Sequence, residues 1–262
     1  MPVPLTEEEK SLPYVKYFWQ DLAPIPQEKL DIWRGPMADP ALATPVERRN
    51  EFLEEGKVAL EVGFTVAPNG TGFVANRTFF PGVTPEMFYW WFGWHCVGPD
   101  LRYKLWDKED HYQARAVEAD YVRDTKVPWS EKTWGVTHDI IEDIGLGAER
   151  LLLGFCKPSD LGYDMSKVGT PACAAMVCAV GKSSSPALMT HKVVETEGGV
   201  WLKSHFWMGY GRNDAGELVK LVPDGQAVPE AAPRALFGHC IKEFSNLAAI
   251  LPSLYAEERD HL

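Results

Sequence analysis

The sequence predicts an α+β domain in which a curved antiparallel sheet wraps one long C-terminal helix. The apolar residues of Pro233–Ile250 recur with the period of an amphipathic helix. Several segments between residues 58 and 210 instead alternate apolar and polar residues, with turn signals between them, which is typical of antiparallel strands. Because pockets often form between such a sheet and helix, we expect a deep cavity there.

The first part of the chain differs in character from the rest. Residues 1–57 are polar and punctuated by prolines, and they contain helix-start signals. Short helices are expected at Thr6–Ser11, Pro26–Arg34 and Pro45–Glu55. We interpret residues 1–57 as a small helical N-terminal region or lid, followed by a main domain of residues 58–262.

A hairpin and an aromatic helix open the main domain. Val58–Val66 and Gly72–Phe80 alternate as strands, and Asn69–Gly70 between them is a turn signal. Thr84–Pro85 then marks a helix start, and the run Met87–Trp94 is apolar on every side. A helix of that kind is buried on every side, so it must pack beneath something large.

Strands account for most of the remaining chain. After a break at Gly98–Pro99, Leu101, Tyr103 and Leu105 alternate as one face of a strand, and a loop ending at His111 follows. Further strands are expected at Val136–Ile144, Arg150–Phe155, Cys173–Val180, Ala187–Thr196 and Val200–Tyr210. Residues 214–232 are polar and predict a loop before the last helix.

Composition limits the classes of partner. The net charge of −11 and the pI near 5.1 disfavour nucleic acid and anionic membranes as partners. No apolar run approaches the roughly 18–20 residues of a membrane span, and the acidic N-terminus lacks the apolar core of a secretory signal. The five cysteines form no Cys-x-x-Cys pair, so we expect reduced thiols in a cytoplasmic protein.

Two residues of the C-terminal helix do not fit a plain core helix. His239 and Glu243 lie one turn apart at the apolar face, and a buried glutamate without a partner is strongly unfavourable. An imidazole beside a carboxylate suits zinc or another borderline divalent metal. The alternative is a helix at the protein surface, with both side chains in contact with water.

The His-x-x-x-Glu spacing recurs in this chain and is therefore a weak signal on its own. The same spacing joins His138 to Glu142 and His191 to Glu195. Residues i and i+4 also share a face of a strand. Spacing alone therefore permits a four-ligand metal site made of His138, Glu142, His239 and Glu243, and it equally permits no metal site.

Five blocks of sequence resemble, in order, the 2,4-diacetylphloroglucinol hydrolase and phloretin hydrolase family. The blocks are Tyr89–His95, Leu101–Trp106, Glu109–Tyr112, Thr137–Gly145 and Gly238–Glu243. The resemblance implies a Bet v 1-like helix-grip fold, with residues 58–262 as the catalytic domain. It also implies a Zn2+ site, whose ligands would be His111, Glu142, His239 and Glu243.

The resemblance implies a reaction as well. Members of the family hydrolyse the carbon–carbon bond between an acyl group and a phenolic ring, so we expect zinc-activated water to attack the carbonyl of a small phenolic ketone. The departing ring must be protonated, and His191 is the first candidate for the general acid, with His205 next.

The same resemblance suggests residues that contact the substrate. Tyr103 is expected to hydrogen-bond a substrate phenol, Tyr210 is a weaker candidate for that task, and His138 is a candidate pocket residue. The asparagine that the family carries three residues after its first zinc histidine is Ala114 here. This departure concerns the identity of the substrate and leaves the metal site intact.

Two other classes of function stay open on the same scaffold. A non-hydrolytic pocket protein would bind a hydrophobic molecule without chemistry, although it has no need of two carboxylates in apolar stripes. A different enzyme, such as a hydrolase of another β-dicarbonyl or a cyclisation catalyst for a polyketide or terpenoid, would use the same pocket. The chain has no nucleophile elbow, phosphate-binding loop or dinucleotide fingerprint. The family and the aromatic content favour a homodimer.

Overall fold

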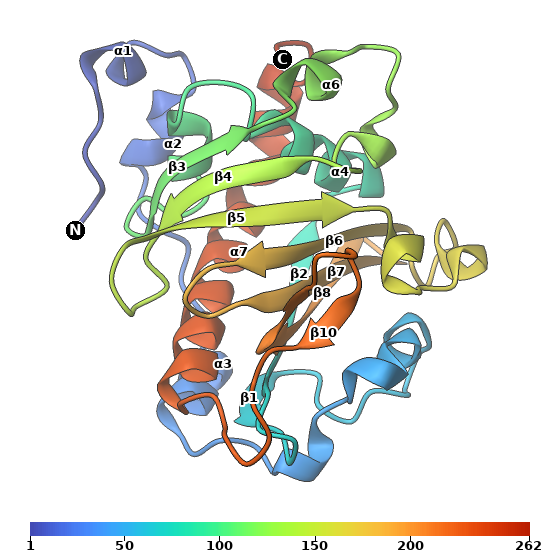
Figure 1. Ribbon diagram of the computed structural model, residues 1–262. Helices are drawn as coiled ribbons and strands as arrows, with labels where there is room; N and C mark the ends of the chain where they lie inside the picture. The colour runs from blue at the N-terminus through green and yellow to red at the C-terminus, as the bar shows by residue number, and fades with distance from the viewer.

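The computed structural model describes residues 1–262 as a mixed fold of one main antiparallel sheet and a long C-terminal helix, as predicted (Figure 1). The α-helices are α1 (Glu7–Lys10), α2 (Val15–Trp19), α3 (Gln27–Arg34), α4 (Pro85–Trp94), α5 (Leu101–Lys104), α6 (Ala119–Arg123) and α7 (Ala231–Glu258). Short 3₁₀ helices lie at Pro40–Leu42, Val46–Leu53, Trp129–Glu131, Pro158–Leu161 and Met165–Lys167. No helix is both long enough and apolar enough to cross a membrane.

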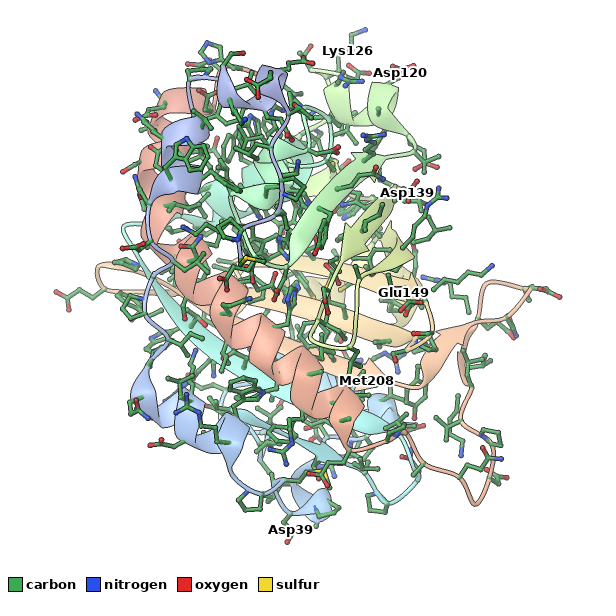
Figure 2. All side chains as sticks on the ribbon, turned by 90° about the vertical axis from the view of Figure 1, so that its left-hand side faces the viewer. Asp39, Asp120, Lys126, Asp139, Glu149 and Met208 are labelled. Atoms are coloured by element: carbon green, nitrogen blue, oxygen red, sulfur yellow. The ribbon has the colours of Figure 1, made fainter.

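The strands form two antiparallel sheets. They are β1 (Gly63–Val66), β2 (Gly72–Pro81), β3 (His111–Ala116), β4 (Thr137–Glu142), β5 (Glu149–Cys156), β6 (Ala175–Lys182), β7 (Ala187–Thr196), β8 (Gly199–Met208), β9 (Tyr210–Arg212) and β10 (Leu218–Lys220). The first eight form one sheet in the order β1-β2-β8-β7-β6-β5-β4-β3, and β9 pairs with β10. Helix α7 crosses one face of the large sheet (Figure 2).

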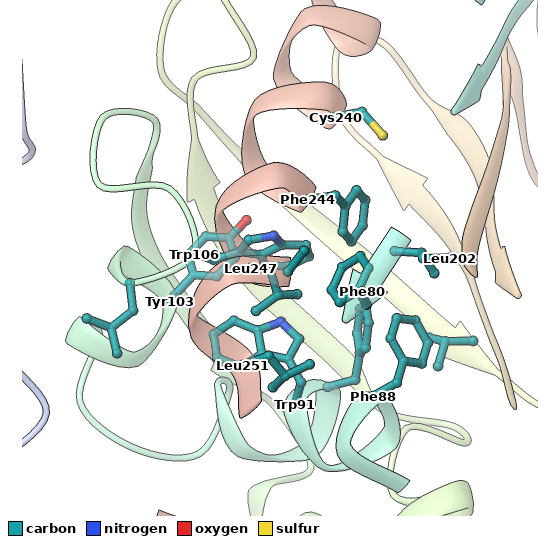
Figure 3. Packing of buried hydrophobic residues seen from close by; sticks show 14 of the residues in the cluster. Phe80, Phe88, Trp91, Tyr103, Trp106, Leu202, Cys240, Phe244, Leu247 and Leu251 are labelled. Atoms are coloured by element: carbon teal, nitrogen blue, oxygen red, sulfur yellow. The ribbon is translucent and has the colours of Figure 1, made fainter. Parts of the chain in front are cut away.

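The apolar side of α7 packs on that face. Seven of its side chains, spaced mostly by three or four residues, are completely buried: Phe237, Cys240, Ile241, Phe244, Leu247, Leu251 and Leu254. Figure 3 shows Phe244 beside Phe80 of β2, with Leu247 and Leu251 in the same cluster. This face therefore positions His239 and Glu243 at the boundary between helix and sheet.

Helix α4 is the buried aromatic helix that the sequence predicts. Trp90, Trp91 and Trp94 have no exposed surface. Thr84 begins the helix by accepting a hydrogen bond from the Met87 backbone N–H, although the bond is long at 3.4 Å. The helix forms part of the main core beneath the sheet.

Residues 1–57 pack on the outside of the main domain. Leu53 is buried in a second apolar cluster on the face of the sheet opposite α7, and the buried Phe52 stacks on His205 at that face. Near the N-terminus, Glu9 forms a buried ion pair with Lys104 of α5, at 2.8 Å. None of residues 1–57 lines the cavity described below.

The segment after Gly98–Pro99 is a helix and not the expected strand. Leu101 and Leu105 share a face in a helix as well as in a strand, so their spacing does not separate the two. The polar residues between them are buried, because Arg102 lies 4.2 Å from the ring of Trp94 and Lys104 binds Glu9. The apparent alternation therefore reflects ion pairs and cation–π contacts, not an exposed strand face.

Other boundaries also differ from the predictions. The segment expected to be a loop up to His111 leads into strand β3, which pairs with β4 at the edge of the sheet through a register shift between His111 and Gln113. The first hairpin strand begins only at Gly63, whose φ of 143° interrupts regular extended backbone. The polar stretch 214–232 contains β10, and α7 continues beyond Ile250 to Glu258.

Candidate metal centre

Four side chains meet where α7 crosses the end of β3 and β4. His111 and Glu142 are paired across these two strands, and His239 and Glu243 project from successive turns of α7. The Nε2 atoms of His111 and His239 are 3.3 Å apart, and each lies 3.7 Å from Glu243 Oε2. Glu142 Oε2 is 3.9 Å from His111 Nε2. The structure therefore brings together all four residues proposed as metal ligands.

Hydrogen bonds behind the two histidines orient their rings. His111 Nδ1 lies 3.2 Å from the backbone oxygen of Tyr103, and His239 Nδ1 lies 3.2 Å from Asp110 Oδ2. Because both partners are acceptors, each Nδ1 carries a proton, and in a neutral imidazole Nε2 then keeps a lone pair. The two Nε2 atoms face one another inside a buried cluster, an arrangement that either a shared proton or a bound cation stabilises.

The charge balance of the cluster also favours a cation. Burial raises the pKa of Glu243 well above its usual range and lowers the pKa of His111 well below its own. Burial also opposes the charged form of His239, but Glu243 and Asp110 outweigh it and raise the pKa of His239 to about 10. Positive charge is therefore favoured at the centre of these ligands.

The spacing of the donor atoms fits a tetrahedral divalent metal. Zinc bonds of about 2.0–2.2 Å place neighbouring ligand atoms about 3.3–3.6 Å apart, close to the observed 3.3–3.9 Å separations. Two imidazoles and two carboxylates also match the ligand types of zinc. The group His111, His239 and Glu243 could thus hold a metal ion.

In a second acidic group nearby, a lysine occupies the position that a metal ion would take. Asp107, Asp110 and His239 also lie close enough together to hold an ion. Lys242 already places its ammonium group 2.6 Å from Asp110 Oδ2 and 3.1 Å from Asp107 Oδ2. The His239 atom on this side is Nδ1, which donates to Asp110. This group therefore supports His239 from behind.

Tyr103 connects the metal centre to its surroundings. Its ring is stacked on His111 with centroids 3.9 Å apart and nearly parallel planes, and its hydroxyl donates a hydrogen bond to Glu142 Oε2. Burial and the adjacent Glu142 raise the pKa of Tyr103 well above its usual range, so this hydroxyl remains a donor. Tyr103 thus fixes one metal-ligand candidate by stacking and another by hydrogen bonding.

The cluster opens into a cavity between the sheet and α7. The cavity has a volume of about 150 Å³, and Tyr103, Glu142, His239 and Glu243 contribute to its wall. Most of the other lining side chains are apolar or aromatic, and they include Phe92, Trp106, Ile140, Phe155, Met189 and Phe206. An engineered apolar cavity of similar size accommodates a benzene molecule, so one aromatic ring fits here.

His191 and His138 both line this cavity, on β7 and β4. His191 is buried, and its Nδ1 lies 2.7 Å from Ser204 Oγ. Burial lowers the pKa of His191 to about 3, so its imidazole is neutral at pH 7. Three of the predicted substrate-contacting or catalytic residues, Tyr103, His138 and His191, thus share one cavity.

His205 and Tyr210 lie outside the cavity, which corrects their predicted roles. Side chains alternate along β8, so Ser204 and Phe206 face α7 while His205 faces the other way and stacks on Phe52, with ring centroids 3.9 Å apart. Tyr210 is buried in the cluster on that opposite face, and its hydroxyl accepts a hydrogen bond from Asn69.

Sequence reasoning missed three polar residues of the site. Asp110 and Lys242 are each adjacent in sequence to a proposed ligand, and this adjacency was a usable signal. His95 received no role, since no polar pattern surrounds it at the end of an apolar helix. It caps α4, where its Nδ1 donates to the backbone oxygen of Trp91, and it lines the cavity.

Comparison with known proteins identifies the family. The family model described as the DAPG hydrolase PhiG domain matches residues 42–256. Phloretin hydrolase from Eubacterium ramulus is 53% identical over 259 residues, covering 98% of this chain and 94% of that protein. A 2,4-diacetylphloroglucinol hydrolase from Pseudomonas sp. is 32% identical over 262 residues, covering 95% of this chain and 89% of that protein.

A second 2,4-diacetylphloroglucinol hydrolase, from Pseudomonas protegens, is 31% identical over 262 residues, covering 95% of this chain and 85% of that protein. A solved protein from Chromobacterium violaceum overlaps 69% of this chain and 97% of its own, but its TM-score of 0.39 and 11% identity are too low to assign a shared fold. The family match and the near-full-length relatives agree with the sequence resemblance. The chain is a member of the DAPG hydrolase family.

Proposed function

We propose that this protein hydrolyses the carbon–carbon bond between an acyl group and a phloroglucinol-type phenolic ring, with zinc as its metal. The observation that carries the proposal is the cluster of His111, Glu142, His239 and Glu243 at the wall of an aromatic cavity. The relatives named phloretin hydrolase and 2,4-diacetylphloroglucinol hydrolase give the substrate class, small phenolic ketones.

The side chains divide the work of this reaction. When bound, zinc supplies a Lewis acid that polarises an oxygen and lowers the pKa of water. In the overall reaction the acyl carbon gains the hydroxyl of water and the ring carbon gains a proton. His191 is neutral, so it is the proposed proton carrier: Ser204 occupies its Nδ1 and leaves Nε2 to take the proton that the attacking water releases and to give it to the ring carbon. Tyr103 orients Glu142 and presents its phenol edge to the cavity.

The protein around the site excludes bulk water from it. His111, His239 and Glu243 are at most 6% exposed. The aromatic walls leave a flat apolar space, in which electrostatic contacts to a substrate are stronger than in water. Every residue that lines the cavity lies in residues 58–262, so we propose this part as the catalytic domain.

We infer further properties from the same features. The antiparallel sheet and long C-terminal helix support a helix-grip, Bet v 1-like arrangement. Five free, buried cysteines support a reducing compartment such as the cytoplasm. The four proposed ligands come from one chain, so the homodimer expected from the family is not needed to complete the site.

Metal analysis combined with turnover tests the proposal. We expect about one zinc per chain in the wild type and hydrolysis of phloretin or 2,4-diacetylphloroglucinol. His239→Ala and Glu243→Ala should lose both, whereas Glu257→Ala, on an exposed part of α7, should keep both. A metal-free wild type that binds phenolic ketones unchanged would instead indicate a carrier, and release of a cyclised product would indicate a cyclisation catalyst.

A further inference from the structure

The cavity wall contains buried polar groups without hydrogen-bond partners, beside the metal-ligand candidates. His138 is 1% exposed and lines the cavity, yet neither of its ring nitrogens has a hydrogen-bond partner. The indole N–H of Trp106, which also lines the cavity, has none either. Buried polar groups in proteins are nearly always paired, so two such groups in one cavity wall indicate a bound molecule that pairs with them.

His95 adds an acceptor to the same wall. Its Nδ1 donates to the backbone oxygen of Trp91 at 2.8 Å, which leaves Nε2 with a lone pair. The ring of His95 lies 5.3 Å from that of His138, in an edge-to-face arrangement. His138, Trp106 and His95 together therefore present both donors and acceptors to the cavity.

These groups suit a neutral hydroxyl and not a charged ligand. Burial lowers the pKa of His95 to about 4 and that of His138 well below its usual range, so both rings are neutral at pH 7. A neutral imidazole has one donor and one acceptor, which is the complement of a phenolic hydroxyl. The adjacent aromatic walls, including Phe155 with its centroid 4.3 Å from that of His138, suit the ring that carries the hydroxyl.

The position of His138 indicates which hydroxyl it contacts. His138, Ile140 and Glu142 all line the cavity from one face of β4, and four strand residues span about 13 Å. A ring that presents its acyl carbon near Glu142 directs the opposite, para position towards His138. His191, the proposed proton donor, lines the same cavity and contacts Phe92, as does His95.

We propose that His138, supported by His95 and Trp106, recognises the para hydroxyl of the phenolic ring that leaves, and so selects trihydroxylated rings. The identity of the ring rests on the proposed function, whereas the hydroxyl-binding character rests on the unpaired nitrogens. His138 is in this view a specificity-determining residue, and it leaves the bond-breaking chemistry to the metal centre.

Paired substrates and two variants test this role. The wild type should prefer 2,4,6-trihydroxyacetophenone over 2,6-dihydroxyacetophenone, which lacks the para hydroxyl, by at least about tenfold in kcat/KM. His138→Leu should reduce that preference to within about threefold, mainly by slowing the trihydroxy substrate. His138→Gln, which keeps a donor and an acceptor, should retain part of it.

His205→Leu is the matched control, because it makes the same change at a buried histidine on the opposite face of the sheet. It should leave the preference unchanged. Trp106→Phe removes the unpaired N–H and keeps an aromatic ring, so it tests the site independently should His138→Leu fail to fold. An unchanged preference in every folded variant at His138 and Trp106 would overturn the proposal.

Phloretin has two phenolic rings, and a pair of substrates that lack the hydroxyl of one ring or of the other distinguishes them. If His138→Leu alters selection for the hydroxyl of the far ring and not for that of the leaving ring, the assignment to the leaving ring is wrong. Calorimetric titration with phloroglucinol gives a readout without turnover, with at least about tenfold weaker binding expected in His138→Leu. Such binding in an enzyme that hydrolyses no aryl ketone would refute the proposed function while keeping the hydroxyl site. Equal binding to both proteins would refute the site.

Discussion

Asp110 provides a direct test of how the protein would tune the proposed metal centre. Its carboxylate accepts a hydrogen bond from His239 Nδ1 at 3.2 Å and pairs with Lys242 at 2.6 Å. Asp110→Asn keeps the size of the side chain and an oxygen that can accept from His239, but it removes the charge. The tautomer of His239 should therefore survive, while the imidazole becomes a weaker metal donor.

The size of the effect follows from the hydrogen bond that changes. A hydrogen bond to a charged group contributes about 1.5–3 kcal/mol, and a neutral bond about 0.5–1.5 kcal/mol. The difference of about 1–2 kcal/mol corresponds to a zinc affinity roughly 5- to 30-fold weaker. Asp110→Ala also removes the acceptor that fixes the tautomer, so its affinity should fall further, towards about 100-fold.

Competition with a chromophoric chelator measures these affinities without any substrate. Asp139→Asn is the matched control, since Asp139 lies on β4 and makes a surface ion pair with Arg150, away from the metal centre. It should bind zinc as the wild type does. If Asp110→Asn binds zinc within twofold of the wild type while His239→Ala loses it, the proposed support of His239 by Asp110 is refuted.

Three further changes have directions set by the structure. Tyr103→Phe removes the hydroxyl bound to Glu142 but keeps the ring stacked on His111. Turnover should therefore fall about 10- to 100-fold with little change in Tm, and unchanged turnover would contradict this role of the hydroxyl. Gly238→Ala places a Cβ 2.5 Å from Trp33 Nε1. This clash should lower Tm, although alanine favours helices more than glycine does, and a raised Tm would show that α3 moves aside. Burial lowers the pKa of Lys29 to about 8 in the folded protein, below the unfolded value of about 10.4. Between these two pH values the unfolded chain binds more protons than the folded one, so the free energy of unfolding rises with pH in this range. Lys29→Met should therefore be most stabilising below about pH 8 and lose that advantage by about pH 10.5, as measured by denaturant unfolding; a pH-independent difference would contradict the argument.

Local patterns in the sequence predicted much of the fold but not the pairing of its edge strand. Alternation located β7 at its observed bounds, and the apolar run of α4 predicted the burial of most of that helix. The pairing of His111 with Glu142 depends on β3, a short edge strand with a register shift, which no local pattern encodes. Only the resemblance to a family indicated that these two residues belong together.

The orientation of His205 could have been predicted from the hairpin that joins β7 to β8. The turn between β7 and β8 pairs Thr196 with Gly199, and counting back along both strands pairs His191 with Ser204. Directly opposite residues share a face of the sheet, so His205 must face away from His191. The two histidines were therefore never interchangeable as candidates for the general acid. Tyr210 could not be placed by the same count, because Gly209 with a φ of 87° interrupts the strand before it.

The proposed metal centre and the hydroxyl site proposed at His138 differ in how many substitutions each can tolerate. The proposed metal centre needs its donors at fixed spacing and a carboxylate behind His239, so the loss of one of them leaves buried charge without a partner. The wall beyond it can exchange one hydroxyl-binding group for another. Ala114, where the resemblance to the family leads us to expect asparagine, lies opposite Ile140 on the neighbouring strand, and Ala116 lies opposite His138. On our proposal, polar recognition lies on β4, where His138 faces a small side chain of β3. We therefore expect differences in substrate among relatives to be concentrated on these two strands, while the four proposed metal ligands stay the same.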